Sequence, residues 1–164
     1  MQLQKKMIQK IRKARITDAK EIYSLINSWS KEGKVLERSL NYIYENIRDF
    51  VVYETKNTII GSCALHVVGW QDLGEIKSLV VLKKFQDKGI GTKLVASCIK
   101  EAKNIGIKNV FALTFVPQFF KKLGFREIDR KNLPHKIWSD CVDCIYFPDC
   151  QEKAVILHLK SLHR

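Results

Sequence analysis

The 164-residue sequence contains only three prolines and no apolar run that approaches the ~20 residues needed to span a bilayer. It also has no internal repeat and no low-complexity tract. These absences exclude a transmembrane protein, a collagen-like repeat and a mostly disordered chain. Since 46% of the residues are apolar, the chain can bury a sizeable core. We therefore expect one soluble globular domain with no membrane partner.

Acidic residues are in the minority, with 17 Asp and Glu against 29 Lys and Arg and a formal net charge of +12. Residues 1–15 hold six basic residues and no acid, which favours a solvated end and leaves a targeting or nucleic-acid-binding arm as the alternative. Because aromatic residues are not interleaved there, we do not expect nucleic acid to be the partner. The charge suits an anionic ligand such as a phosphorylated cofactor.

Cysteine is present at five positions, but no secretory segment accompanies it, so we expect a reducing, cytoplasmic compartment. Cys63 and Cys98 lie in apolar surroundings and are expected in the core. A separate cluster comprises Cys141, Cys144 and Cys150, with His135 upstream and His158 downstream. Three thiolates and one imidazole would make a structural zinc site, while free or redox-active thiols and an iron–sulfur centre remain alternatives.

Hydrophobic periodicity predicts an α+β domain around a mixed sheet. The expected strands cover residues 11–16, 50–53, 59–68, 74–82, 109–115 and 153–159. One expected helix begins near residue 18, and three others cover residues 39–47, 89–105 and 118–123. Gly106 is expected to end the helix at 89–105 as a left-handed cap. We divide the chain into a basic extension at 1–10 and one domain at 11–164, with a cysteine-containing segment at 133–152.

The most informative segment is an apolar strand that enters a loop with two glycines and then a long amphipathic helix. The first-turn amides of a helix have no intrahelical acceptor, and the helix dipole adds partial positive charge there. Gly89 and Gly91 would let a ligand approach this backbone closely. The arrangement is typical of a pyrophosphate site, and a purely structural turn is the alternative.

Residues 86–91 resemble the Gln/Arg-x-x-Gly-x-Gly/Ala signature of the GNAT superfamily of N-acetyltransferases. Residues 11–19 are similar to the opening strand and helix start of that family, and residues 119–125 to its closing Phe-Tyr-x-x-x-Gly-Phe element. The resemblance implies a splayed, mixed and mostly antiparallel sheet with helices on its faces, and acetyl-CoA as cosubstrate.

The same resemblance implies residues that hold the cofactor. Backbone amides would bind the pyrophosphate from Gln86, Asp87, Lys88, Gly89, Ile90, Gly91 and Thr92. The pantetheine arm would pair with the strand edge at Leu79, Val80 and Val81. The N–H of Val81 would then polarise the thioester carbonyl.

A narrower resemblance is to the acetyltransferase domain of N-acetylglutamate synthases, and it rests on residues 33–39, 61–79 and 110–114. It is strongest for the short forms, which have no amino-acid-kinase domain. This resemblance implies L-glutamate as acceptor, N-acetyl-L-glutamate as product, and the first step of arginine biosynthesis. It also makes a homodimer an expectation.

Individual residues can be assigned roles on that basis. Glu75 would take the ammonium proton of the acceptor, or would be a sheet-edge charge. Arg38 and Lys77 are candidates for binding the substrate carboxylates, or are surface cations. Ser39 would add a hydrogen bond or cap a helix. For His66 a structural role is favoured over a catalytic one.

Two departures from the family pattern concern the proton donor and the acceptor. Phe120 stands where many members have a Tyr that returns a proton to the CoA thiolate. Residues 133–141 stand where longer synthases have an Arg-Arg-Ser-Lys-like segment that binds glutamate. Acceptance of another small amine or a protein N-terminus therefore remains an alternative. A further alternative is that the protein is a non-catalytic module that binds CoA or nucleic acid.

Overall fold

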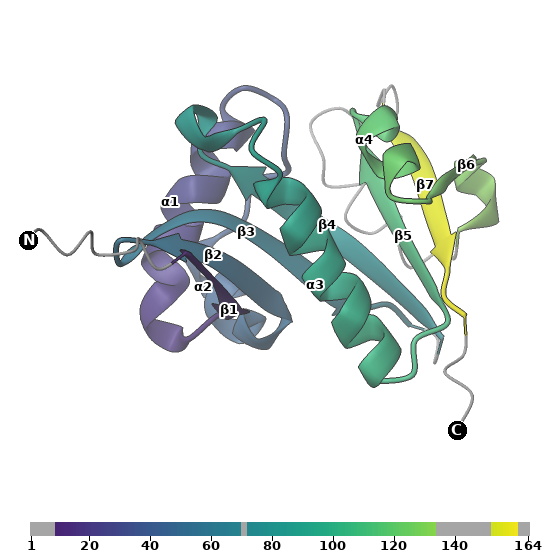
Figure 1. Ribbon diagram of the computed structural model, residues 1–164, viewed down its shortest axis with the longest axis horizontal. Coiled ribbons are helices and arrows are strands. Elements are labelled where there is room, and N and C mark those ends of the chain that lie inside the picture. Colours follow the sequence, from purple (N-terminus) through teal and green to yellow (C-terminus); the bar gives the residue numbers. More distant parts are fainter. Residues whose placement is uncertain (1–8, 70–71, 134–151, 161–164) are drawn as a thin grey trace, which may run out of the picture. The chain divides into compact units, whose positions relative to one another are not determined.

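The structure is a computed structural model that describes residues 9–69, 72–133 and 152–160 (Figure 1). Its strands are β1 (Gln9–Lys13), β2 (Phe50–Thr55), β3 (Thr58–Val67), β4 (Leu73–Val81), β5 (Asn109–Thr114), β6 (Arg126–Ile128) and β7 (Lys153–His158). Its helices are α1 (Ala19–Ser30), α2 (Leu40–Glu45), α3 (Ile90–Asn104) and α4 (Pro117–Lys122). Short 3-10 turns are η1 (Ile16–Asp18), η2 (Ile47–Asp49), η3 (Lys83–Phe85) and η4 (Arg130–Asn132).

The described strands form one seven-stranded sheet in the order β1-β2-β3-β4-β5-β7-β6. β4 and β5 pair in parallel, whereas β1 with β2, β5 with β7 and β6 with β7 pair antiparallel. The predicted α+β class with a mixed, mostly antiparallel sheet is therefore confirmed. Among the described residues, no helix has the length and apolar character that crossing a membrane requires.

Two compact units make up the chain, and each contains separate stretches of sequence. The first unit comprises residues 1–63 and 78–97. Within it, one face of α1 is buried at helical spacing through Ile22, Leu25, Ile26 and Trp29, as the sequence pattern predicts. This unit holds β1, β2, the connection from β4 to α3, and the first half of α3.

The second unit comprises residues 64–77 and 98–164. Its core includes Val68, Leu73, Phe111, Leu133 and Ala154, which come from the β3–β4 hairpin, from β5, from the end of η4 and from β7. A glycine in β4 allows close packing here. A Cβ at Gly74 would lie 3.1 Å from Ile107 Cδ1 and 3.2 Å from Leu65 Cδ1, so a larger side chain would displace both.

Some element boundaries differ from those the sequence predicts. The first strand ends at Lys13 instead of residue 16, because Ile16 is exposed and begins η1. This strand also starts at Gln9, inside the predicted basic extension. β6 is not predicted at all, because its three residues are exposed or partly buried and carry no alternating pattern.

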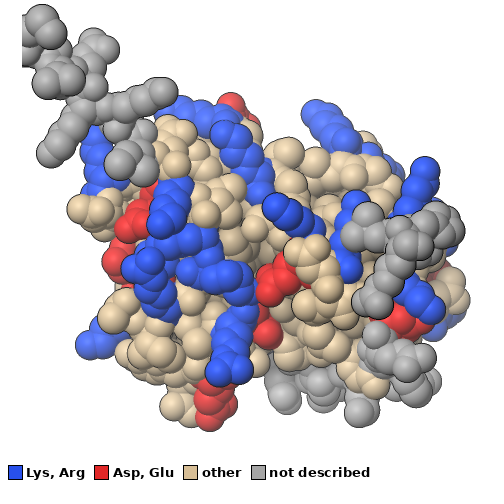
Figure 2. Space-filling model, turned by 60° about the horizontal axis from the view of Figure 1, so that its bottom comes forward, with Lys and Arg blue, Asp and Glu red and all other residues tan. Residues whose placement is uncertain are grey.

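Basic side chains are common at the surface, in keeping with the net charge of +12. On the face shown in Figure 2, Lys and Arg predominate over Asp and Glu. Lys10 and Lys13 lie on β1, which is an edge strand because it comes first in the sheet order. Charged residues at an edge oppose pairing with a strand of another molecule.

Candidate active site

The connection from β4 to α3 is the candidate cofactor loop. Leu82 N–H donates to Ile60 O at 2.8 Å, which anchors the loop start on β3. η3 follows, and the Gln86 amide closes it by donating to Lys83 O at 3.2 Å. The first helical bond of α3 runs from Lys93 N–H to Gly89 O at 3.1 Å. The amides that precede Lys93 in the helix are therefore available to an external acceptor.

The backbone of this loop is left-handed at two places. Asp87 has φ 59° and Gly89 has φ 78°. A Cβ at Gly89 would meet nothing within 4 Å, so the space beside this residue is open to a ligand. An anion beside Gly89 would lie at the N-terminus of α3, where backbone amides and the helix dipole favour a group such as a pyrophosphate.

A glycine in β3 keeps α3 close to the sheet below this loop. A Cβ at Gly61 would lie 3.0 Å from Leu94 Cδ1 and 3.3 Å from both Ile90 Cγ2 and the Val80 carbonyl oxygen. The first turns of α3 therefore pack directly over β3 and the end of β4. The sequence does not assign Gly61 a structural role, because a glycine within a strand has several explanations.

Three lysines give the loop a positive charge. Lys84 Nζ lies 5.3 Å and Lys88 Nζ 5.5 Å from the centroid of the Phe85 ring, and both lysines are exposed. Lys83 is exposed as well. Asp87 is the single acid between residues 83 and 88. The loop thus attracts anions by its net charge in addition to its backbone dipoles.

β4 carries a bulge immediately before the predicted pantetheine-binding edge. Val68 N–H donates to Leu73 O and Leu82 N–H to Ile60 O, so the nine residues 60–68 face the ten residues 73–82. The extra residue coincides with Ser78, which has φ 54°. Ser78 is buried, and its Oγ has no hydrogen-bond partner among the described residues. A bulge re-aims the strand that follows it, here the backbone of residues 79–81.

Glu75 and Lys77 lie before this bulge on one face of β4, because alternate residues of a strand share a face. Both are partly buried. The register with β5 places Glu75 opposite Phe111, which is fully buried. The carboxylate predicted to accept a proton thus has an apolar neighbour on that side.

Arg38 lies between α1 and α2, and α1 holds its backbone. Asn27 Nδ2 donates to Arg38 O at 3.3 Å, and Arg38 N–H donates to Asn27 Oδ1 at 3.4 Å. The guanidinium carbon lies 4.7 Å from the Tyr42 ring centroid. Ser39 Oγ caps α2 by accepting from Tyr42 N–H at 3.0 Å, which is the helix-capping role that the sequence also allows.

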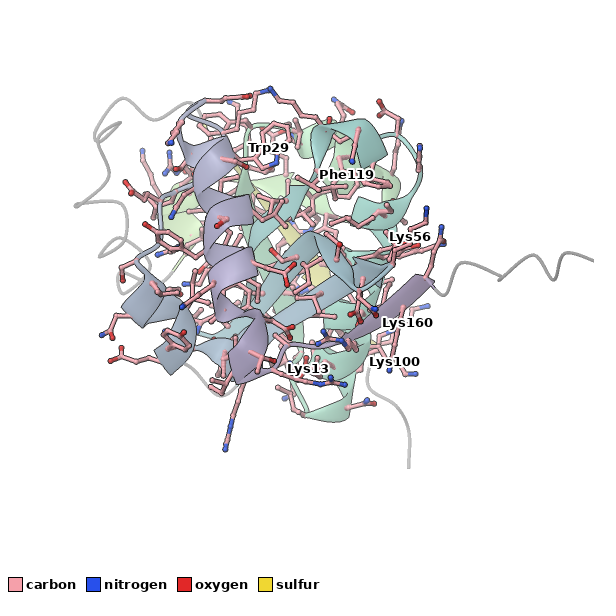
Figure 3. The ribbon with its side chains drawn as sticks, turned by 90° about the vertical axis from the view of Figure 1, so that its left-hand side faces the viewer. Lys13, Trp29, Lys56, Lys100, Phe119 and Lys160 are labelled. Atoms are coloured by element: carbon pink, nitrogen blue, oxygen red, sulfur yellow. The ribbon has the colours of Figure 1, made fainter. Side chains whose placement is uncertain are left out.

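A cluster around Trp29 connects the segment between α1 and α2 to the cofactor loop. In Figure 3, Trp29 lies at the C-terminal end of α1. Lys34 Nζ is 4.9 Å and Lys83 Nζ 5.5 Å from its ring centroid. Glu32 pairs with Lys83 and, at 3.3 Å, with Lys34. These two lysines, Lys83 foremost, hold the pKa of Glu32 below its ordinary value. The sequence predicts no role for Trp29 or Glu32 here.

Phe120 belongs to an aromatic cluster with its neighbours in and after α4. Its ring centroid lies 5.1 Å from that of Phe119 and 5.2 Å from that of Phe125, both edge-on. Phe120 and Phe125 are buried. The ring therefore supplies packing, and it carries no proton for a leaving group.

The remaining candidates concern thiols and metals. Cys63 and Cys98 are buried, as predicted. Cys141, Cys144 and Cys150 lie outside the described residues, so zinc binding by them stays a prediction. Within the described part of the chain, no group of three or more His, Cys, Asp or Glu residues is arranged to hold a metal ion.

The chain belongs to the acetyltransferase (GNAT) family, which it matches over residues 16–125. It is therefore an N-acetyltransferase. It is 40% identical to an uncharacterized N-acetyltransferase of Chlorobaculum tepidum over 146 residues, which are 89% of this chain and 94% of the relative. It is 36% identical to an amino-acid acetyltransferase of Mycobacterium tuberculosis over 134 residues, 79% of this chain and 75% of that protein.

A solved structure of N-acetylglutamate synthase from Neisseria gonorrhoeae is also similar. It contains coenzyme A and N-acetyl-glutamate, and it superposes with a TM-score of 0.85 at 29% sequence identity. The match covers 95% of this chain and 36% of the synthase. The similarity supports the fold as well as the family assignment.

Proposed function

We propose that this protein transfers the acetyl group of acetyl-CoA to the amino group of an amino acid, with L-glutamate as the acceptor. The observation that carries the proposal is the basic, left-handed loop at residues 83–89, which opens α3 beside an unobstructed Gly89. Relatives that are amino-acid acetyltransferases support the class of acceptor. The synthase structure with bound N-acetyl-glutamate supports glutamate in particular.

The donor would be bound mainly by backbone. Amides of Ile90, Gly91 and Thr92 would donate hydrogen bonds to the pyrophosphate oxygens at the positive end of α3. Lys84 and Lys88 would add charge at the loop surface. The bulged edge of β4 would pair with the pantetheine arm, and the Val81 N–H would donate to the thioester carbonyl oxygen, where negative charge develops.

The acceptor would be bound by its carboxylates and activated at its amine. Arg38 and Lys77 would each bind a carboxylate. Glu75 would remove one ammonium proton, since only the neutral amine has a lone pair for attack. The amine nitrogen then bonds to the thioester carbon and gives its second proton to water, the carbon–sulfur bond breaks, and CoA leaves as a thiolate. Because Phe120 has no proton to give, water would protonate this thiolate.

The acceptor is tested by mass spectrometry of acetylated products. The purified protein is incubated with acetyl-CoA and an equimolar pool of amino acids and polyamines. We expect N-acetylglutamate as the dominant product. A different acetylated amine would keep the acetyl transfer and overturn the glutamate assignment. Bound acetyl-CoA with no product at all would favour the non-catalytic binding module instead.

The role of Arg38 is tested by Arg38→Gln. We expect the KM for the amino acid to rise about tenfold to hundredfold, as for a lost hydrogen bond to a charged group. The KM for acetyl-CoA should change little, and Arg38→Lys should restore part of the loss. Steady-state kinetics measure these values. Arg48→Gln is the matched control, because Arg48 is an exposed arginine of η2 in the same unit. Equal effects of Arg38→Gln and Arg48→Gln would remove Arg38 from the site.

A further inference from the structure

We propose that His66 is a positioning residue for Glu75 and the exit route for the proton that Glu75 takes from the acceptor. The inference rests on the proposed function, in which Glu75 is the base. It concerns two side chains that lie nine residues apart in the sequence and come from different strands, His66 from β3 and Glu75 from β4.

The register of the β3–β4 hairpin places the two residues face to face. Val68 N–H donates to Leu73 O at 3.1 Å, and such a bond joins directly opposite residues of an antiparallel pair. Two residues further from the turn, the residue opposite His66 is Glu75. The bulge at Ser78 lies beyond this point and leaves the register here intact. Opposite residues point to the same face, with Cβ atoms roughly 5 Å apart.

The surroundings make His66 the suitable partner for a proton on Glu75. On β5, the residue opposite Glu75 is the buried Phe111, which exchanges no proton. Val68 and Leu73, the next pair on the same face, are buried and apolar. Lys77 shares this face of β4, but a charged ammonium has no lone pair to accept a proton.

His66 also leads toward solvent. It is partly buried, so part of its side chain is accessible to water, whereas Ala64 and Val68, which alternate with it on the same face, are buried. Imidazole can accept a proton on one ring nitrogen while it releases one from the other. A partly accessible side chain with these properties, close to the turn of the hairpin, connects the partly buried Glu75 to water.

The proposed sequence of proton transfers is balanced. Glu75 takes a proton from the substrate ammonium and becomes a neutral carboxylic acid. This acid passes the proton to the unprotonated nitrogen of His66, and the resulting imidazolium loses a proton to water. Both side chains then return to their starting states, and one proton has moved from the amine to solvent.

The test is the kinetics of His66→Leu with and without free imidazole, once the wild-type enzyme has been shown to form product. We expect kcat to fall about 10²-fold, the size of one general acid–base contribution, while both KM values change less than about twofold. Added imidazole should restore kcat in proportion to its concentration. A purely structural role would not produce this rescue.

The control is Lys103→Leu. Lys103 is exposed on α3 in the same unit and has no place in the proposed chemistry. This variant should keep the wild-type kcat and show no response to imidazole. If His66→Leu fails to fold, as judged by circular dichroism, His66→Gln provides a polar replacement with the same expected loss and rescue.

The outcomes separate this inference from the proposed function. If Glu75→Gln is slow but His66→Leu keeps the wild-type kcat, the role of His66 is overturned and Glu75 remains the base. If His66→Leu is slow and imidazole has no effect, the proton route through His66 is likewise overturned. If Glu75→Gln is as active as wild type, the proposed base itself is wrong and His66 loses its role with it.

Discussion

A network of three charged residues links β1, η1 and β2. Arg12 binds Asp18 through two hydrogen bonds, of 2.7 Å and 3.0 Å, and Glu54 through a third of 3.1 Å. The Arg15 amide donates to Asp18 at 2.7 Å. The side chains of Arg12 and Asp18 are 11% and 8% exposed. A carboxylate removed from water in this way depends on its partners, so the loss of one partner is costly.

Asp18→Asn should lower the free energy of unfolding at pH 7 by about 3–5 kcal/mol, the range for breaking a buried ion pair. The hydrogen bond from Arg12, foremost, holds the pKa of Asp18 below its ordinary value. This stabilisation is therefore complete above the unfolded-state pKa of about 3.9 and is lost as the pH falls through the lower folded-state pKa. Urea titrations between pH 7 and pH 2 measure both effects.

The control for this residue is Asp129→Asn. Asp129 is exposed and accepts a hydrogen bond from the Lys131 amide, which Asn can also accept. We expect a change below about 1 kcal/mol. If the free energy of unfolding of Asp18→Asn falls with pH in the same way as that of the wild type, Asp18 is not the source of the acid-sensitive stability.

At the scale of the element, α3 lies between two left-handed glycines. Gly89 precedes it with φ 78°, and Gly106 follows it with φ 87°. Gly106 ends the helix in a Schellman motif, in which Ile107 N–H donates to Ala102 O and Gly106 N–H to Lys103 O. A Cβ at either glycine would meet nothing within 4 Å. The two positions thus share the same left-handed backbone and open surroundings, and only Gly89 lies at the N-terminal end of α3, where the pyrophosphate is proposed to bind.

Gly89→Ala and Gly106→Ala should each lower the free energy of unfolding by about 1–2 kcal/mol, the cost of a left-handed alanine. Only Gly89→Ala should weaken CoA binding, since its methyl group would enter the space proposed for the pyrophosphate. Chemical denaturation and isothermal titration with CoA measure the two effects. Unchanged CoA affinity in Gly89→Ala would place the pyrophosphate elsewhere.

At the scale of the whole molecule, both compact units draw on the same elements. β3, β4 and α3 each contribute residues to both units. One unit cannot unfold without disrupting strands and a helix that the other contains. We therefore expect cooperative unfolding of the described domain instead of independent melting of its parts.

Differential scanning calorimetry should show one transition with equal calorimetric and van't Hoff enthalpies. CoA at about 100 times its Kd should raise the free energy of unfolding by about 2.7 kcal/mol and move the entire transition upward. The loop variant Gly89→Ala provides the control, because its transition should shift less at the same CoA concentration. Two transitions, with only one of them moved by CoA, would contradict this expectation.

The sequence by itself determines the features that arise from neighbouring residues. The apolar stripe of α3, its glycine cap, and the loop with Gly89 and Gly91 all depend on local backbone chemistry, and the structure contains each of them. The burial of Cys63 and Cys98 likewise follows from apolar neighbours along the chain. Local order of this kind predicted the mixed sheet, whereas the family was predicted from the resemblance of residues 11–19, 86–91 and 119–125 to its motifs.

The tertiary structure alone decided which residues stand beside the candidate site residues. Asn27 holds the backbone of Arg38 across eleven residues, and Trp29 meets Lys83 across more than fifty. His66 faces Glu75 only because the hairpin register places 68 opposite 73, and the extra residue at Ser78 then changes that register. Such pairings depend on strand register and on the packing of distant segments, and neither leaves a periodic signal in the chain.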